Sequence, residues 1–243
     1  MSDGRRALVG LAAVVGFHVV DHRFVPQRWH LATHAGAAGA AVVAGHALGL
    51  DDDDLGLGRA RLGAGARGGA AVAAATVAGV AAVAVSPRCR GLFDDARVRS
   101  ASTGQLARWA LLEIPLATAV YEEVLFRGVA LGLARRHLGD GGAVALTSAL
   151  FGAWHVLPAL EDRHANPATA DRHPAATVAA TVVATAAAGA GFALLRLRTG
   201  SLLAPVVAHT ATNVVPLLAA RLVQRTAPPA SAATGPEPDR RAP

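Results

Sequence analysis

The sequence predicts an all-α fold, a polytopic transmembrane helical bundle of about seven spans. Hydrophobic residues make up 53% of the 243 residues and charged residues 16%, whereas about a quarter of a soluble domain is charged. Several apolar stretches are close to the length that crosses a bilayer. The rival interpretation is a soluble alanine-rich helical protein, because alanine contributes little to membrane insertion. The length of the apolar stretches favours the membrane protein.

The charge pattern also fits a membrane protein. Arginine carries almost all of the net charge of +6 and lies between and beside the apolar stretches. There it sets topology and contacts lipid headgroups, so the lipid bilayer is the expected partner, although the arginines divide too evenly to fix the orientation. No basic patch has interleaved aromatic residues, so nucleic acid is not an expected partner. Cys89 is the single cysteine, which excludes an internal disulfide and a multi-cysteine zinc site.

The first half of the chain contains three expected spans, over residues 7–20, 31–50 and 68–85. The first resembles the start of a secretory signal, but no small-residue cleavage site follows, so we expect an uncleaved span. The acidic run 51–54 is interpreted as a solvated loop, with a cation site as the lesser alternative. The arginine-rich stretch 88–99 is expected to be a loop at the membrane surface.

The second half contains the remaining expected spans, over residues 106–135, 143–157, 175–195 and 201–222. Pro115 is expected to kink the first of them, residues 139–142 to form a turn, and Pro158 to end the second. Small residues at 189–191 suit close helix packing. We therefore expect a single transmembrane domain over residues 1–225, with its catalytic part at about 106–222, and a disordered tail over 226–243.

Three ionisable side chains, Glu122, Glu123 and Arg127, lie inside the apolar span 106–135. Each costs several kcal/mol at such depth unless it is paired or hydrated. Glu123 and Arg127 are four residues apart, in the order that favours an ion pair on one helix face. Glu122 is rotated away from that face, so it is left to contact another helix, water or a metal ion.

Three further polar residues lie within the later spans. His155 follows Phe151 by one helical turn, and Asn213 follows His209 by one turn. A single histidine on an apolar face is more often a hydrogen-bonded core residue than a catalyst. Together with Glu122, however, His155, His209 and Asn213 can converge near the middle of the bilayer.

This set of residues suits hydrolysis. A carboxylate in a low-dielectric site can take a proton from water, and histidine and asparagine can donate hydrogen bonds to the oxyanion that forms at a carbonyl. Alternatively, Glu122, His155 and His209 could bind a divalent metal such as zinc, which polarises the water. The metal-free and the metal-bound mechanisms are equally open. The chain lacks the His-Glu-x-x-His pair of ordinary zinc proteases.

The motifs Glu-Glu-x-x-x-Arg, Phe-x-x-x-His and His-x-x-x-Asn, in this order on successive apolar segments, resemble those of the CPBP family. This is the CAAX protease and bacteriocin-processing group, also called the ABI family, which is related to type II CAAX prenyl endopeptidases and is labelled metalloprotease by convention. The resemblance implies a multi-pass protease of the cell membrane that cuts a membrane-associated protein or peptide.

The resemblance also implies a role for each motif residue. Glu122 would activate water with His155, and His209 with Asn213 would stabilise the oxyanion. Glu123 and Arg127 would support the site. Phe151 belongs to the second motif.

Two other functions stay open at this point. A proton-coupled or ion-coupled transporter would also explain buried ionisable groups, and a non-catalytic immunity or scaffold protein would keep the motifs for packing. The spans before residue 106 are expected only to scaffold the site. The paired histidines His18 and His22, and His30 and His34, are interpreted as membrane-interface residues.

Overall fold

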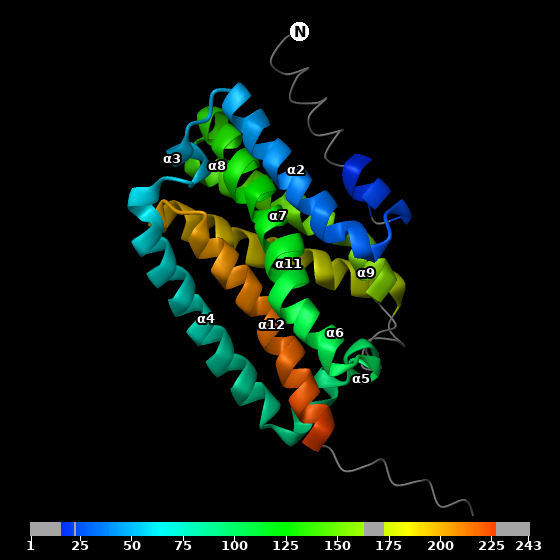
Figure 1. Cartoon of the computed structure of the whole chain (residues 1–243). Coiled ribbons are helices and arrows are strands. Elements are labelled where there is room, and N and C mark those ends of the chain that lie inside the picture. The colour runs from blue at the N-terminus through cyan, green and yellow to red at the C-terminus, as the bar shows by residue number, and fades with distance from the viewer. Residues whose placement is uncertain (1–15, 22, 163–172, 227–243) are drawn as a thin grey trace, which may run out of the picture.

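The computed structural model describes residues 16–21, 23–162 and 173–226, and most of the chain in these ranges is helical, with no β-strand there (Figure 1). The predicted all-α fold is confirmed. Only the end of the first expected span, residues 16–20, is described, and it is helical. The predicted tail lies outside the described residues after Thr226.

The described elements follow one another along the chain with short connections. The first half contains α2 (Gln27–Ala47), α3 (Asp52–Leu55), η1 (Arg59–Arg61), α4 (Leu62–Ala84), η2 (Pro87–Phe93) and α5 (Ala96–Ser100). The second half contains α6 (Thr103–Arg108), η3 (Trp109–Val120), α7 (Tyr121–Glu123), η4 (Val124–Ala130), α8 (Leu131–Trp154), α9 (Val156–Asp162), α11 (Pro174–Thr199) and α12 (Leu203–Thr226).

Residues 103–138 form one continuous helix, the glutamate helix, from α6 to the first turns of α8. Its segments η3 and η4 are π-helical and flank the glutamates of α7. Such wide turns are rare and are found mostly at functional sites. The predicted turn at 139–142 reduces to Gly139, whose φ of +64° is open to glycine without strain. Pro158 does not end a helix but lies in the first turn of α9, where no intrahelical N–H bond is lost.

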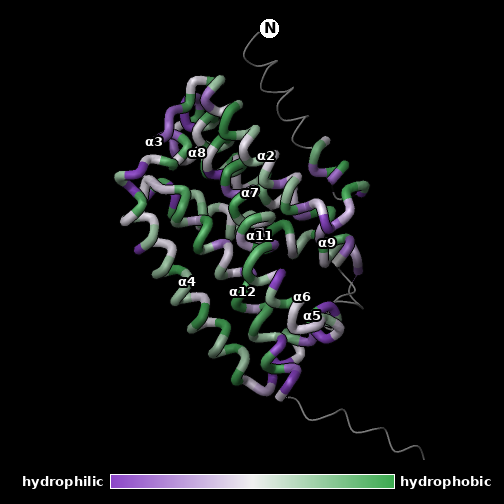
Figure 2. The backbone as a smooth tube through the Cα atoms, viewed as in Figure 1, coloured by the Kyte–Doolittle hydropathy of each residue, from purple (hydrophilic) through white to green (hydrophobic). Residues whose placement is uncertain are grey.

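Four helical stretches among the described residues are long and apolar enough to cross a membrane: Asp52–Ala84, Thr103–Glu161, Pro174–Thr199 and Leu203–Thr226. The second of these reverses at Gly139. Figure 2 shows that hydrophobic residues predominate along these helices. The predicted count of about seven spans is not confirmed. The helix α2, predicted as a span, is 21 residues long but is not among these four stretches, because its histidines lower its hydropathy.

The glutamate helix lies in the middle of the bundle (Figure 1). There α2 packs on η3 and η4, α12 packs on η3 and along α4, and α11 packs along α8. Small residues allow the closest of these contacts, since a Cβ atom at Gly69 would lie 2.7 Å from Cβ of Val207. Gly189, in the predicted small-residue stretch, is buried in this way, whereas Gly191 faces open space.

The acidic run forms a short helix and not the predicted loop. Asp51 caps α3 by accepting a 2.7 Å hydrogen bond from the backbone N–H of Asp54, and carboxylates stabilise a helix at its N-terminus. The buried core beside the glutamates is largely aromatic, with Tyr121, Phe126, Phe151 and Trp154 in one cluster.

Candidate active site

Glu123 is the fully enclosed member of the glutamate pair. It is 0% exposed, and its Oε1 accepts hydrogen bonds from Nη1 of Arg127 at 2.9 Å and from Nδ1 of His209 at 2.8 Å. The ion pair predicted from the spacing is therefore present. The contact with His209 joins the first sequence motif to the third, from a helix 86 residues away along the chain.

Arg127 lies deep inside the bundle, at 1% exposure. Its guanidinium carbon lies 4.0 Å from the centre of the Phe151 ring and 5.4 Å from that of Phe192. Both are cation–π distances. The helix α11 comes close enough only because Gly189 has no side chain, since a Cβ there would lie 3.0 Å from Nη2 of Arg127. The positive charge of Arg127 is thus stabilised by the carboxylate of Glu123 and by the rings of Phe151 and Phe192.

Glu122 has a different environment, although it is also mostly buried, at 8% exposure. Its Oε1 accepts a 3.1 Å hydrogen bond from the indole N–H of Trp154. Among the described residues its Oε2 has no hydrogen-bond partner, as is also true of Oε2 of Glu123, but Oε2 of Glu122 lies 3.8 Å from Nε2 of His209. That separation is too long for a direct hydrogen bond but short enough for one water molecule to bridge.

His209 stands between the two glutamates. Because a carboxylate only accepts, the bond to Glu123 requires a proton on Nδ1. The atom Nε2 therefore faces Glu122, and it accepts a hydrogen bond when the ring is neutral and donates one when the ring is charged. The ring is stacked on Phe192 at 5.1 Å and meets the edge of Phe151 at 5.8 Å, so its orientation is fixed.

His155 lies apart from this cluster. Its Nδ1 donates to the carbonyl oxygen of Phe151 at 2.8 Å, its Nε2 has no partner among the described residues, and the side chain is half-buried. No hydrogen bond or ion pair joins His155 to Glu122 within the part of the chain that the structure describes. Phe151 links the two histidines, because its ring meets those of both His155 and His209.

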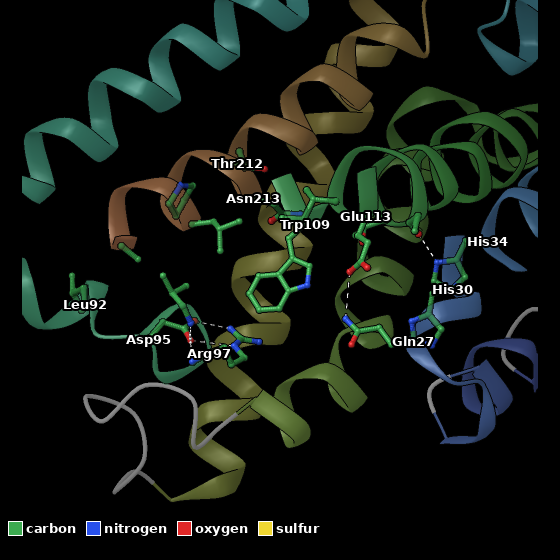
Figure 3. A pocket seen from close by; sticks show the side chains of 17 residues that line it. Gln27, His30, His34, Leu92, Asp95, Arg97, Trp109, Glu113, Thr212 and Asn213 are labelled. Atoms are coloured by element: carbon green, nitrogen blue, oxygen red, sulfur yellow. Dashed lines mark hydrogen bonds and ion pairs between the residues drawn. The ribbon is translucent and has the colours of Figure 1, made fainter. Parts of the chain in front are cut away.

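Asn213 is exposed and lines a cavity of about 540 Å³ between α2, η3 and α12 (Figure 3). We call it the larger cavity, because the second cavity described below has a volume of about 410 Å³. Residues four apart share a helix face, so Asn213 lies one turn beyond His209. Thr118, which also lines the cavity, lies one turn before Glu122. The larger cavity therefore comes within about one helical turn of Glu122 and His209, neither of which lines it.

The first half of the chain supplies side chains that the sequence did not identify as part of the site. His18 is buried, stacks on Trp154 at 3.5 Å and hydrogen-bonds to the carbonyl oxygen of that residue. His34 stacks on Tyr121 at 4.5 Å and is held at 2.7 Å by the buried carboxylate of Asp21. Both histidines contact the aromatic residues beside Glu122, contacts that the interface interpretation does not predict.

The remaining histidines of those pairs differ from one another. His30 hydrogen-bonds to the carbonyl oxygen of Val25 and lines the larger cavity, whereas His22 lies outside the described residues. The sequence carries little indication that His18 and His34 belong to the site, because each contacts a residue far away in the sequence. Trp154 adjoins His155, but adjacent residues on a helix face different ways.

The described residues hold no group of three or more histidine, cysteine, aspartate or glutamate side chains placed to bind a metal ion. Glu122 and His209 offer two free ligand atoms 3.8 Å apart, whereas catalytic zinc sites use three protein ligands. The set Glu122, His155 and His209 is not assembled in this structure. The predicted metal-bound site stays a prediction.

The fold and this cluster define a class, the polytopic helical membrane proteins with a carboxylate–imidazole site inside the bundle. Residues 104–215 match the family model described as type II CAAX prenyl endopeptidase Rce1-like. This match, over 112 of the 243 residues, supports membership of the CAAX protease family, which the three motifs resemble. No curated protein and no solved structure gives a significant match to the chain.

Proposed function

We propose that this protein is an intramembrane endopeptidase that hydrolyses a peptide bond of a membrane-associated protein or peptide. The observation that carries the proposal is the pair of free atoms, Oε2 of Glu122 and Nε2 of His209, which lie 3.8 Å apart in a buried site. A water molecule between them would donate to the carboxylate and accept from a protonated imidazole. Glu122 is the general base.

The charges of the buried groups support a protonated His209. Glu122 and Glu123 carry two negative charges, and Arg127 supplies one positive charge. A charged His209 makes the cluster electrically neutral, which lowers the cost of keeping it out of water. Its Nδ1–H then stays on Glu123, and its Nε2–H points at the water and at the substrate carbonyl.

The reaction runs through one tetrahedral intermediate. Glu122 takes a proton from water as the hydroxyl oxygen bonds to the carbonyl carbon. Nε2–H of His209, with the side-chain amide of Asn213, stabilises the resulting oxyanion. The carbon–nitrogen bond then breaks, and Glu122 returns its proton to the leaving amine. Because His155 is half-buried and has a free Nε2, we assign it to proton exchange with water at the edge of the site.

The larger cavity is the proposed binding place of the substrate. Its volume of about 540 Å³ and its mixed apolar and polar lining suit a short extended peptide segment. Since the family description names prenyl endopeptidases, a peptide with a prenylated C-terminal cysteine motif is the first substrate to test. The same peptide without the lipid, and an unrelated apolar peptide, separate lipid recognition from peptide recognition.

The test is cleavage of these peptides by protein reconstituted in liposomes of the native cell-membrane lipids. We expect cleavage by the native protein and by the control Asp52→Asn, which changes an exposed carboxylate. Glu122→Gln should be inactive and folded. If Glu122→Gln cleaves at the native rate, Glu122 is not the base and the proposal fails. Proton or ion flux without any cleavage would point to a transporter.

A chelation experiment tests whether cleavage depends on a metal ion. The proposed steps use protein groups alone, because only two ligand atoms converge at Glu122 and His209. We expect the reconstituted protein to keep its activity after dialysis against a strong chelator. Loss of cleavage on chelation, restored by zinc in proportion to the metal bound, would show that the ion takes part. His155 would then be the first candidate for a third ligand.

A further inference from the structure

A second cavity, of about 410 Å³, shares no lining residue with the glutamate cluster and lies beside Gly200 and Thr199 at the end of α11. We call it the arginine cavity, because four guanidinium groups line it. They belong to Arg61, Arg135, Arg196 and Arg198, and Asp53 is the single carboxylate among the lining residues. Such an excess of positive charge in one hollow favours an anionic ligand.

Three of these cations have no carboxylate partner within the described part of the chain. Arg135 is paired with Asp140 at 2.7 Å, but no ion pair involves Arg61, Arg196 or Arg198 there. Arg61 is held over the turn between α11 and α12, since a Cβ at Gly200 would lie 3.2 Å from its Cδ. Gly200 has a φ of +67°, so this close approach depends on glycine.

Arg196 forms the fixed part of the arginine cavity. It is 3% exposed, and its Nη2 donates to the carbonyl oxygens of Asp53 at 2.7 Å and Asp54 at 2.9 Å. Its Nη1 makes no hydrogen bond to the described residues. A buried guanidinium bound only to carbonyls keeps its full positive charge, which makes an anion beside it favourable.

The place of this cavity in the bundle indicates where the anion comes from. Three of the candidate membrane spans have an end here, because α11 ends at Thr199, α12 begins at Leu203 and α4 begins at Leu62. The ends of spans lie at the depth of the lipid headgroups. Apolar side chains are also exposed nearby, Leu62 at 46% and Leu194 at 42%, and these can contact acyl chains.

We propose that the arginine cavity binds a phosphate group, that of an anionic phospholipid headgroup, between Arg61, Arg196 and Arg198. Arginine matches phosphate oxygens with paired N–H donors, and basic pockets between transmembrane helices hold anionic headgroups in this way. The site is independent of the glutamate cluster and of the proposed protease activity. It would fix the depth of the α11–α12 turn in the membrane.

The experiment titrates purified full-length protein, in uncharged detergent, with soluble dioctanoyl phosphatidylglycerol. The readout is the midpoint of thermal unfolding, because a ligand that binds the folded state raises it. Dioctanoyl phosphatidylcholine tests the need for net negative charge, and inorganic phosphate tests the need for a lipid. The double variant Arg61→Gln/Arg198→Gln removes two exposed guanidinium groups, and Arg88→Gln/Arg90→Gln makes the same charge change elsewhere on the surface.

We expect a saturable rise in the midpoint with phosphatidylglycerol and a much weaker one with phosphatidylcholine. Arg61→Gln/Arg198→Gln should weaken the apparent affinity roughly tenfold, from the loss of charge-assisted hydrogen bonds, and the Arg88/Arg90 variant should bind as the native protein does. Equal loss in both variants would overturn the site. Equal affinity for inorganic phosphate would overturn the lipid source. Arg198→Gln alone replaces the double variant if the latter fails to fold.

Discussion

The adjacent carboxylates Glu122 and Glu123 have different environments on the two sides of the glutamate helix. On one side Glu123 is enclosed, and both Arg127 and His209 donate to its Oε1. On the other side Glu122 receives one neutral donor, the indole of Trp154, and keeps Oε2 free toward His209. A rotation of one residue along a helix is about 100°. That rotation separates a side chain that joins the glutamate helix to α12 from one that is available to react.

The contrast extends to the surroundings of the two carboxylates. Arg127, Phe151 and Gly189 close the Glu123 side with tight contacts. The Glu122 side is bordered by aromatic rings that the first half of the chain holds in place, through His18 on Trp154 and His34 on Tyr121. The first half of the chain therefore contacts the residues beside Glu122 directly and does not only support the site from a distance.

The largest expected effect on stability comes from removing the cation of the enclosed side. Arg127→Met leaves Glu123 buried with only His209 as a partner, and losing one member of a buried ion pair costs about 3–5 kcal/mol. Unfolding in detergent titrated with a denaturant measures this loss. Arg127→Lys keeps the charge but loses the planar contact with Phe151, so an intermediate value is expected. A fully stable Arg127→Met would show that the pair is dispensable.

A smaller effect is expected from crowding the same side. Gly189→Ala places a methyl group 3.0 Å from Arg127 and 3.1 Å from Phe151, and overpacking of this kind costs about 1–3 kcal/mol. Gly191→Ala on the same helix is the matched control, since nothing lies within 4 Å of its Cβ position. The control should be neutral or slightly stabilising. Equal unfolding free energies for the two variants would contradict the close packing described for α11.

A smaller effect still is expected from the residue that orients Glu122. Trp154→Phe keeps an aromatic ring but removes the N–H that orients Glu122, so cleavage should slow about tenfold, as expected from one hydrogen bond to a charged group. Trp29→Phe, at an exposed position on α2, is the control and should leave the rate unchanged. Peptide cleavage in liposomes measures both. An unchanged rate for Trp154→Phe would mean that the indole does not position the base.

The sequence predicts the local parts of this site well and the distant parts poorly. The Glu123–Arg127 pair follows from four-residue spacing on one helix, and the helical fold follows from apolar stretches and their turns. The bond from His209 to Glu123, the donor Trp154 and the stacking of His34 all join segments far apart in the chain. No local pattern encodes which faces meet, so these contacts depend on how the helices pack.

The lack of a local pattern for helix packing also explains why two residues expected in the site, His155 and Asn213, do not contact the glutamates in the structure. His155 was grouped with Glu122 because both lie within apolar spans, but its half-buried ring is bonded within its own helix. Asn213 shares a face with His209, as the spacing predicts, yet it lines the larger cavity and does not contact the glutamates.

The measurement that tests this division most directly compares Glu122→Gln with Glu123→Gln in two assays, peptide cleavage and free energy of unfolding. Glu122→Gln should lose cleavage by about 100-fold to 10,000-fold, the usual worth of a general base, while its stability stays near native, because the amide oxygen can still accept from Trp154. Glu123→Gln should be strongly destabilised, because Arg127 is left as an uncompensated buried charge. The reverse pattern, or equal effects in both assays, would contradict the separate roles of the two glutamates.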